Sequence, residues 1–143
     1  MNLYHGGQPG FRPGDIILPH PTHHRPDCDW CASGTDDNHL PDRVFATTDR
    51  LYGKFYASKL VRGWLYAVRA VDGSELVESD SDPFPSYHAP SLQVTRVLER
   101  AVELTMTERR RIWRAWCAAD KARGMAPNPV ADWQVREMLG ISR

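Results

Sequence analysis

The sequence lacks most features that would assign it to a membrane, a secretory pathway or a charged partner. Its 18 basic side chains balance 18 acidic ones, so no net field draws it toward nucleic acid or lipid. No apolar run approaches the roughly 20 residues of a membrane span, and no basic segment followed by an apolar run opens the chain. The three cysteines are an odd number, which argues against a disulfide framework. These absences favour a cytoplasmic, monomeric domain.

Short strand patterns separated by turn residues run through the first hundred residues. The expected strands are Asn2 to His5, Asp15 to Leu18, Arg43 to Thr47, Trp64 to Val71, Glu75 to Glu78 and Leu92 to Leu104. Glu75 to Glu78 is expected to pair with Trp64 to Val71 across an Asp72-Gly73 turn. The acidic, proline-rich segment Ser79 to Pro90 is expected to be irregular. A shift in the apolar register near Arg96 indicates a β-bulge or a break.

Helix signals occur at three places. Thr48 or Asp49 can cap a helix over Arg50 to Val61. The segment Thr105-Met106-Thr107-Glu108 has the form of a capping box, so a helix is expected from Thr107 to Arg123. A short final helix is expected over Pro129 to Leu139.

The segment from residue 19 to residue 42 shows neither the two-residue alternation of a strand nor the 3.6-residue period of a helix, and it is expected to be a long loop. It contains a His-x-x-His pair, His20 and His23, and a Cys-x-x-Cys pair, Cys28 and Cys31. Two imidazoles and two thiolates satisfy a tetrahedral zinc ion completely, so such a site would be structural and not catalytic. His24 is an alternative ligand, and an ordinary surface loop is the alternative to zinc.

Several short motifs follow one another in a fixed order. They are Tyr4-His5-Gly6, Phe45-Ala46-Thr47 with Leu51-Tyr52-Gly53, Trp64 to Val68, Glu78-Ser79-Asp80, Ser86-Tyr87 and Leu98-Glu99. Taken in this order, they resemble the rifamycin ADP-ribosyltransferases over roughly residues 2 to 124. The resemblance implies an α+β fold in which two small, mostly antiparallel sheets form a cleft for NAD+, flanked by helices. Residues 1–124 would form that domain, and residues 125–143 a helical extension packed on it.

The resemblance also implies a reaction and its residues. NAD+ would be cleaved and its ADP-ribose passed to an acceptor, through an oxocarbenium-like state that needs an oriented sugar and a nearby negative charge. His5 would act in catalysis and bind the adenosine ribose, the main chain of Gly6 would hold the carboxamide, and Phe45 would stack on nicotinamide. The remaining residues expected to bind the dinucleotide are Tyr4, Thr47, Tyr52 and Tyr56.

The resemblance leaves the carboxylate and the acceptor less defined. Asp80 is the expected catalytic carboxylate, with Glu78 and Asp82 as alternatives in the same acidic segment. The expected acceptor is a rifamycin-like small molecule, otherwise a protein or nucleic acid. The alternatives are an enzyme like the NAD-dependent RNA 2'-phosphotransferases, an NAD glycohydrolase, and an inactive zinc-stabilised binding module.

Overall fold

A computed structural model of the chain describes residues 1–19, 42–79, 84–122, 136–137 and 139–141. The chain divides into two compact units, Met1–Val102 and Glu103–Arg143. The boundary expected after residue 124 and most of the expected final helix lie outside the described residues. No helix in the described ranges is long and apolar enough to cross a membrane.

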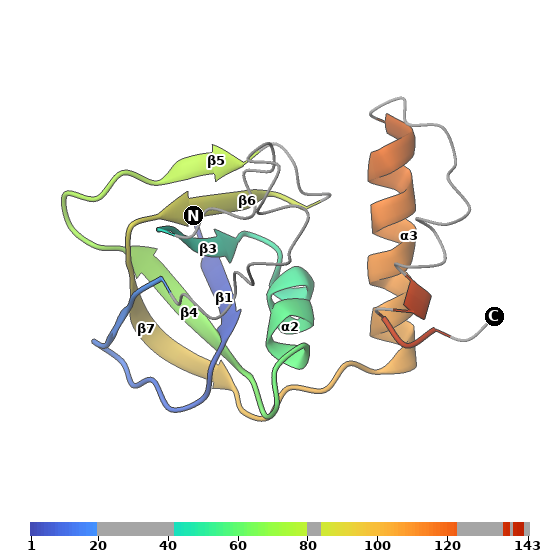
Figure 1. Ribbon diagram of the computed structural model, residues 1–143, viewed down its shortest axis with the longest axis horizontal. Coiled ribbons are helices and arrows are strands. Elements are labelled where there is room, and N and C mark those ends of the chain that lie inside the picture. Colours follow the sequence, from blue (N-terminus) through green and yellow to red (C-terminus); the bar gives the residue numbers. More distant parts are fainter. Residues whose placement is uncertain (20–41, 80–83, 123–135, 138, 142–143) are drawn as a thin grey trace. The chain divides into compact units, whose positions relative to one another are not determined.

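The first unit is built on one antiparallel sheet and one helix. Its strands are β1 (Leu3–Gly7), β2 (Ile16–Ile17), β3 (Val44–Thr47), β4 (Trp64–Ala70), β5 (Val77–Ser79), β6 (Ser86–Ala89) and β7 (Leu92–Glu99). They form a seven-stranded sheet in the order β2-β7-β4-β1-β3-β6-β5, shown in Figure 1. The α+β class is therefore confirmed, but the prediction of two sheets is wrong. The pairing of Tyr4 on β1 with Thr47 on β3 joins the two groups of strands into one sheet.

The strand pairing at the β5 edge also differs from the prediction. β5 pairs with β6, with Val77 opposite His88 and Ser79 opposite Ser86, and not with β4. The segment expected to be irregular thus contains a strand. Ser86 and His88 are only 3% and 7% exposed, so polar side chains occupy the buried positions that sequence reasoning assigns to apolar ones.

The largest apolar cluster lies on one face of this sheet. Its buried members are Leu3, Ile17, Val44, Ala46, Tyr66, Val68, Ala89, Leu92 and Val94. They come from six strands between β2 and β6, so one continuous core covers every strand of the sheet except β5 at its edge. The bulge expected near Arg96 is confirmed, since the register between β4 and β7 shifts between Ala67 and Val68, opposite Arg96 and Val94.

Helix α2 (Arg50–Ser58) packs on the opposite face of the sheet, beside β1 in Figure 1. The Asp49 carboxylate accepts a hydrogen bond of 3.0 Å from the Tyr52 amide, as expected of an N-cap. A Cβ on Gly6 would lie 2.1 Å from the Gly53 carbonyl oxygen and 2.4 Å from the Ala57 nitrogen. Helix and strand therefore touch through their backbones, and only glycine permits this distance at residue 6.

The second unit contains α3 (Met106–Ala122). The predicted capping box is confirmed: the Thr105 amide donates to the Glu108 carboxylate, and the Glu108 amide donates to the Thr105 hydroxyl, both at 3.1 Å. Ile112 is fully buried. The guanidinium of Arg136 lies 5.3 Å from the centroid of the Trp113 ring, which supports packing as the role of this tryptophan.

Candidate functional site

His5 is held in a defined orientation where β1 meets β3. Its Nδ1 lies 2.7 Å from the main-chain oxygen of Phe45. A carbonyl oxygen only accepts hydrogen bonds, so Nδ1 carries the proton and Nε2 is the acceptor nitrogen of the neutral ring. The ring also stacks against Tyr66, with centroids 6.5 Å apart and planes inclined by 28°. Both its tautomer and its plane are therefore set by the fold.

The glycine that makes room for this ring is Gly7. A Cβ at Gly7 would lie only 2.5 Å from Nε2 of His5, because residues two apart on a strand share a face. Gly6 lies on the other face, against α2. In the His-Gly-Gly sequence, Gly6 leaves room for α2 and Gly7 leaves room for the His5 ring.

Tyr66 anchors the loop that follows β1, and sequence reasoning missed it. Its ring is fully buried, its hydroxyl donates to the main-chain oxygen of Gln8 at 2.5 Å, and it accepts from the Phe11 amide at 3.3 Å. Tyr66 also lies directly opposite His5 in the β1–β4 register. The sequence predicted a strand over Trp64 to Val71, but it contains no signal for this register.

Burial raises the pKa of Tyr66 above its usual 10.0, the Phe11 hydrogen bond lowers it, and the charge of Asp15 raises it. The folded state therefore holds the Tyr66 proton more tightly than the unfolded state does. This proton has no effect on how stability changes with pH below pH 10, and stability falls as the pH rises above 10. We expect Tyr66→Phe to remove that part of the alkaline loss and to lower stability at pH 7 by about 1 kcal/mol. Urea unfolding of both proteins from pH 7 to 11 measures this, and parallel pH curves would contradict it.

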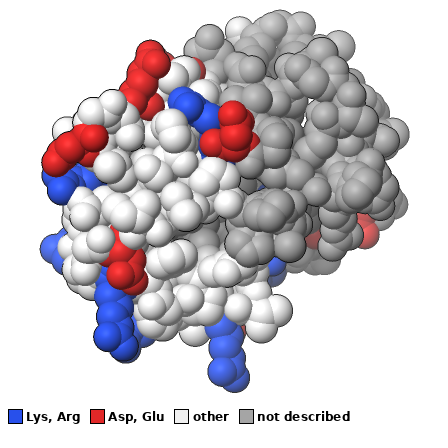
Figure 2. Space-filling model, turned by 60° about the vertical axis from the view of Figure 1, so that its left-hand side comes forward, with Lys and Arg blue, Asp and Glu red and all other residues white. Residues whose placement is uncertain are grey.

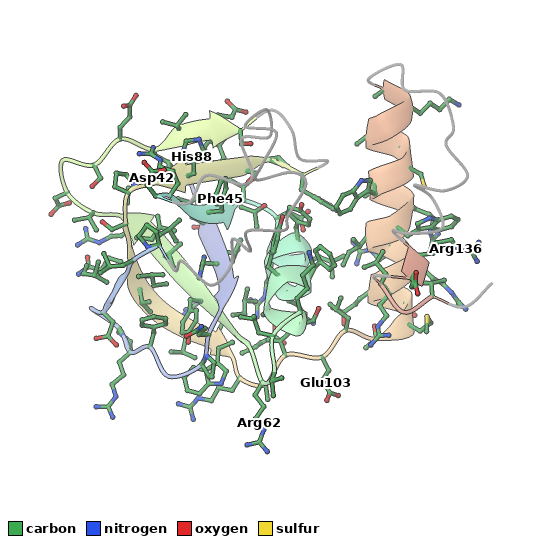
Figure 3. The ribbon with its side chains drawn as sticks, viewed as in Figure 1. Asp42, Phe45, Arg62, His88, Glu103 and Arg136 are labelled. Carbon is green, nitrogen blue, oxygen red and sulfur yellow. The ribbon has the colours of Figure 1, made fainter. Side chains whose placement is uncertain are left out.

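Phe45 lies on the α2 face of β3, where it contacts His88 of β6. The two ring centroids are 5.3 Å apart with planes inclined by 57°, and both side chains are labelled in Figure 3. Phe45 is half-buried, so part of its ring is accessible. Arg43 donates from Nε to Nδ1 of His88 at 2.8 Å. The sequence analysis assigned no role to Arg43 or His88.

Thr47 and Tyr4 have structural contacts on the α2 face. The Thr47 hydroxyl donates to the Pro85 oxygen at 2.7 Å and accepts from the Asp49 amide at 3.1 Å. Its only donor is therefore used on Pro85, and its oxygen holds the N-cap residue of α2. Tyr4 packs against a cluster of Ala57, Leu65 and Val102. The structure does not bring these two side chains together with the His5 ring.

Tyr52 and Tyr56 are likewise placed away from the His5 ring. Tyr52 has no exposed surface; it stacks on Phe84 at 4.6 Å, and its hydroxyl lies 3.0 Å from that of Tyr56. A fully buried ring offers no face to a ligand, so the expected stacking role of Tyr52 is not supported. Tyr56 is half-buried, with the Lys59 ammonium 5.0 Å from its ring centroid.

Of the three candidate carboxylates, the structure places Glu78. It is exposed on β5 and lies in one row with Tyr87 and Ala46 across the neighbouring strands. Ala46 belongs to the same core face as Leu3, and His5 shares that face of β1 by alternation. Glu78 is therefore on the His5 side of the sheet. Asp80 and Asp82 lie outside the described residues.

The zinc prediction also falls outside the described ranges, because His20, His23, Cys28 and Cys31 are all within residues 20–41. Among the residues that the structure describes, no group of three or more His, Cys, Asp or Glu side chains is placed to hold a metal ion. On the face shown in Figure 2, acidic and basic side chains are scattered among uncharged ones, in line with the balanced charge of the sequence.

Comparison of the chain with protein family models, with curated proteins and with solved structures found no match.

Proposed function

We propose that this protein binds NAD+, cleaves the bond between nicotinamide and ribose, and transfers ADP-ribose to an acceptor. The observation that carries the proposal is the fixed imidazole of His5. Its Nδ1 donates to the Phe45 oxygen, so Nε2 is the acceptor nitrogen of the neutral ring. A ribose hydroxyl is the matching donor. Because the ring is also held by Tyr66, little orientation remains to be fixed when the sugar binds.

Phe45 and Gly6 add to the proposal. The Phe45 ring is half-buried on the α2 face of β3, the opposite face of the sheet from the His5 ring, and is flat, of the kind that stacks on nicotinamide. β1 and β3 share one register pair, Tyr4 with Thr47, and the main chain of Gly6 continues along β1 beyond it. We assign the carboxamide of nicotinamide to the Gly6 backbone at this position. The glycine itself is required by α2, so this contact uses only main-chain groups.

The reaction needs few groups because the leaving nicotinamide is already activated by its positive charge. The bond from C1' of the ribose to the ring nitrogen breaks, and its electron pair leaves with neutral nicotinamide. The acceptor's nucleophilic atom forms a new bond to C1' and loses its proton to a carboxylate or to solvent. A carboxylate near C1' also stabilises the positive charge that develops there. We assign this role to Asp80, with Glu78 and Asp82 as the other residues to be tested.

For the acceptor we propose a rifamycin-like small molecule, before a protein or a nucleic acid. The balanced charge supports this order, because binding to nucleic acid normally needs an excess of Lys and Arg near the site. Zn2+, if bound by the loop of residues 20–41, would stabilise that loop and take no part in transfer.

Release of nicotinamide from NAD+ tests the proposal directly. We expect the purified protein to release nicotinamide faster with rifamycin than without it, and Asp80→Asn to abolish release while NAD+ still binds. Glu78→Gln and Asp82→Asn test the alternative carboxylates, and Asp72→Asn, which removes an exposed aspartate after β4, is the matched control. Equal release with and without rifamycin would redirect the acceptor to water or a macromolecule. Neither release nor NAD+ binding would overturn the proposal.

A further inference from the structure

Arg43 is a half-buried cation that pairs with no carboxylate among the described residues. It lies immediately before β3 and is partly covered. In the described part of the chain the ion pairs join Arg50 and Lys54 to Glu99 and Arg69 to Asp72, and none involves Arg43. Partial burial without an opposite charge costs free energy. A residue of this kind is expected where an anion from outside the chain supplies the missing charge.

His88 fixes the orientation of that guanidinium. The Nε of Arg43 donates to Nδ1 of His88 at 2.8 Å, and a guanidinium always keeps its protons. Nδ1 of His88 is therefore an unprotonated acceptor, and protonating it would remove the bond. His88 is only 7% exposed, so it holds Arg43 from the interior. The Nε edge of Arg43 is used by this contact, and its two Nη groups form the edge that can bind an anion.

The surroundings of Arg43 indicate the kind of anion. Phe45 lies two residues along β3, about 7 Å away for extended chain, and shares its face with Arg43 and His88. The described side chains on this face of β3, β6 and β5 include no carboxylate. A flat ring beside a cation suits a ligand that carries both a planar ring and a phosphate.

We propose that Arg43, positioned by His88, binds a phosphate group of a nucleotide ligand. Where the ligand is NAD+, which rests on the proposed function, this phosphate is part of its pyrophosphate. The same chemistry would bind free pyrophosphate in the absence of any transfer reaction. Arg43 is the binding residue, and His88 acts through it.

Calorimetric titration of Arg43→Gln tests this assignment. The phosphate-bearing probes are NAD+, ADP-ribose and inorganic pyrophosphate, and the phosphate-free probe is nicotinamide riboside. We expect Kd for the phosphate-bearing probes to rise about 10- to 100-fold, as for loss of a charged hydrogen-bonding pair, with little change for nicotinamide riboside. Arg69→Gln is the matched control, since it removes an exposed arginine on β4. Arg43→Lys is expected to give an intermediate loss of affinity, because lysine keeps the positive charge but lacks the paired N–H donors of the guanidinium.

His88→Gln and the double variant with Arg43→Gln test whether His88 acts only by orienting Arg43. If His88 acts through Arg43, the double variant binds pyrophosphate no more weakly than Arg43→Gln alone. Additive losses, or losses equal for nicotinamide riboside and pyrophosphate, would overturn the proposal. An unchanged NAD+ affinity in Arg43→Gln that still releases nicotinamide would also overturn it and leave the proposed function standing. Arg43-dependent pyrophosphate binding without nicotinamide release would do the reverse.

Discussion

His5→Asn is expected to lower the rate of NAD+ cleavage about 100-fold while changing the free energy of unfolding by less than about 1 kcal/mol. Asparagine places an amide N–H at the δ position, where it can donate to the Phe45 oxygen as Nδ1 of histidine does. It has no atom at the ε position, so the ribose loses its acceptor. Nicotinamide release under saturating NAD+ and urea unfolding of the same protein measure the two quantities.

His5→Gln is the complementary control. Glutamine places an amide at the ε position but has no group to donate to the Phe45 oxygen, so it is expected to retain more activity than asparagine and to be less stable. The reversed order of the two variants would mean that His5 serves the fold alone. Activity unaffected by either variant would remove His5 from the mechanism.

Gly6→Ala is expected to destabilise the protein by about 3 kcal/mol or more, because its Cβ would overlap backbone atoms that have little room to move. The nearest of these are the Gly53 oxygen, at 2.1 Å, and the Ala57 nitrogen, at 2.4 Å. Either α2 must move from β1 or the strand must distort. The measurement is the urea midpoint at pH 7, with the slope checked for two-state behaviour.

Gly73→Ala provides the reference for glycine replacement without a clash. A Cβ there meets no atom within 4 Å, but the backbone has φ of +81°, so the cost is that of the conformation alone, about 1 kcal/mol. If Gly6→Ala were no worse than Gly73→Ala, the close approach of α2 to β1 would be incorrect.

Features controlled by neighbours in sequence were predictable. The capping box at Thr105 and Glu108 and the Asp49 cap follow from side chains three residues from their partners. The bulge near Arg96 was visible because its residues break the alternation of a single strand. β6 was missed because Ser86 and His88 are buried polar residues. The pairing of β5 with β6 was missed because the Asp72-Gly73 turn suggested the nearer strand, β4.

The candidate site was predictable only one residue at a time. The Tyr-His-Gly motif identified His5, but the sequence contains no signal that its Nδ1 bonds to a residue 40 positions later. Tyr66 and Arg43 were missed for the same reason, since their roles come from strand register. Tyr52 was assigned to the ligand because it follows a motif, whereas helix periodicity and the Tyr56 contact place it in the packing of α2. Motif order indicated a region, whereas strand register determines which side chains meet.

His5 donates its hydrogen bond to the main-chain oxygen of Phe45, so positions 5 and 45 differ in how well they tolerate substitution. Every amino acid at position 45 supplies the same carbonyl, so that side chain can be exchanged without loss of the bond. Position 5 must supply both a donor at δ and an acceptor at ε, a combination that only histidine offers. We therefore expect position 45 to vary among aromatic residues in descendants of this sequence, while position 5 stays fixed as long as the activity is under selection.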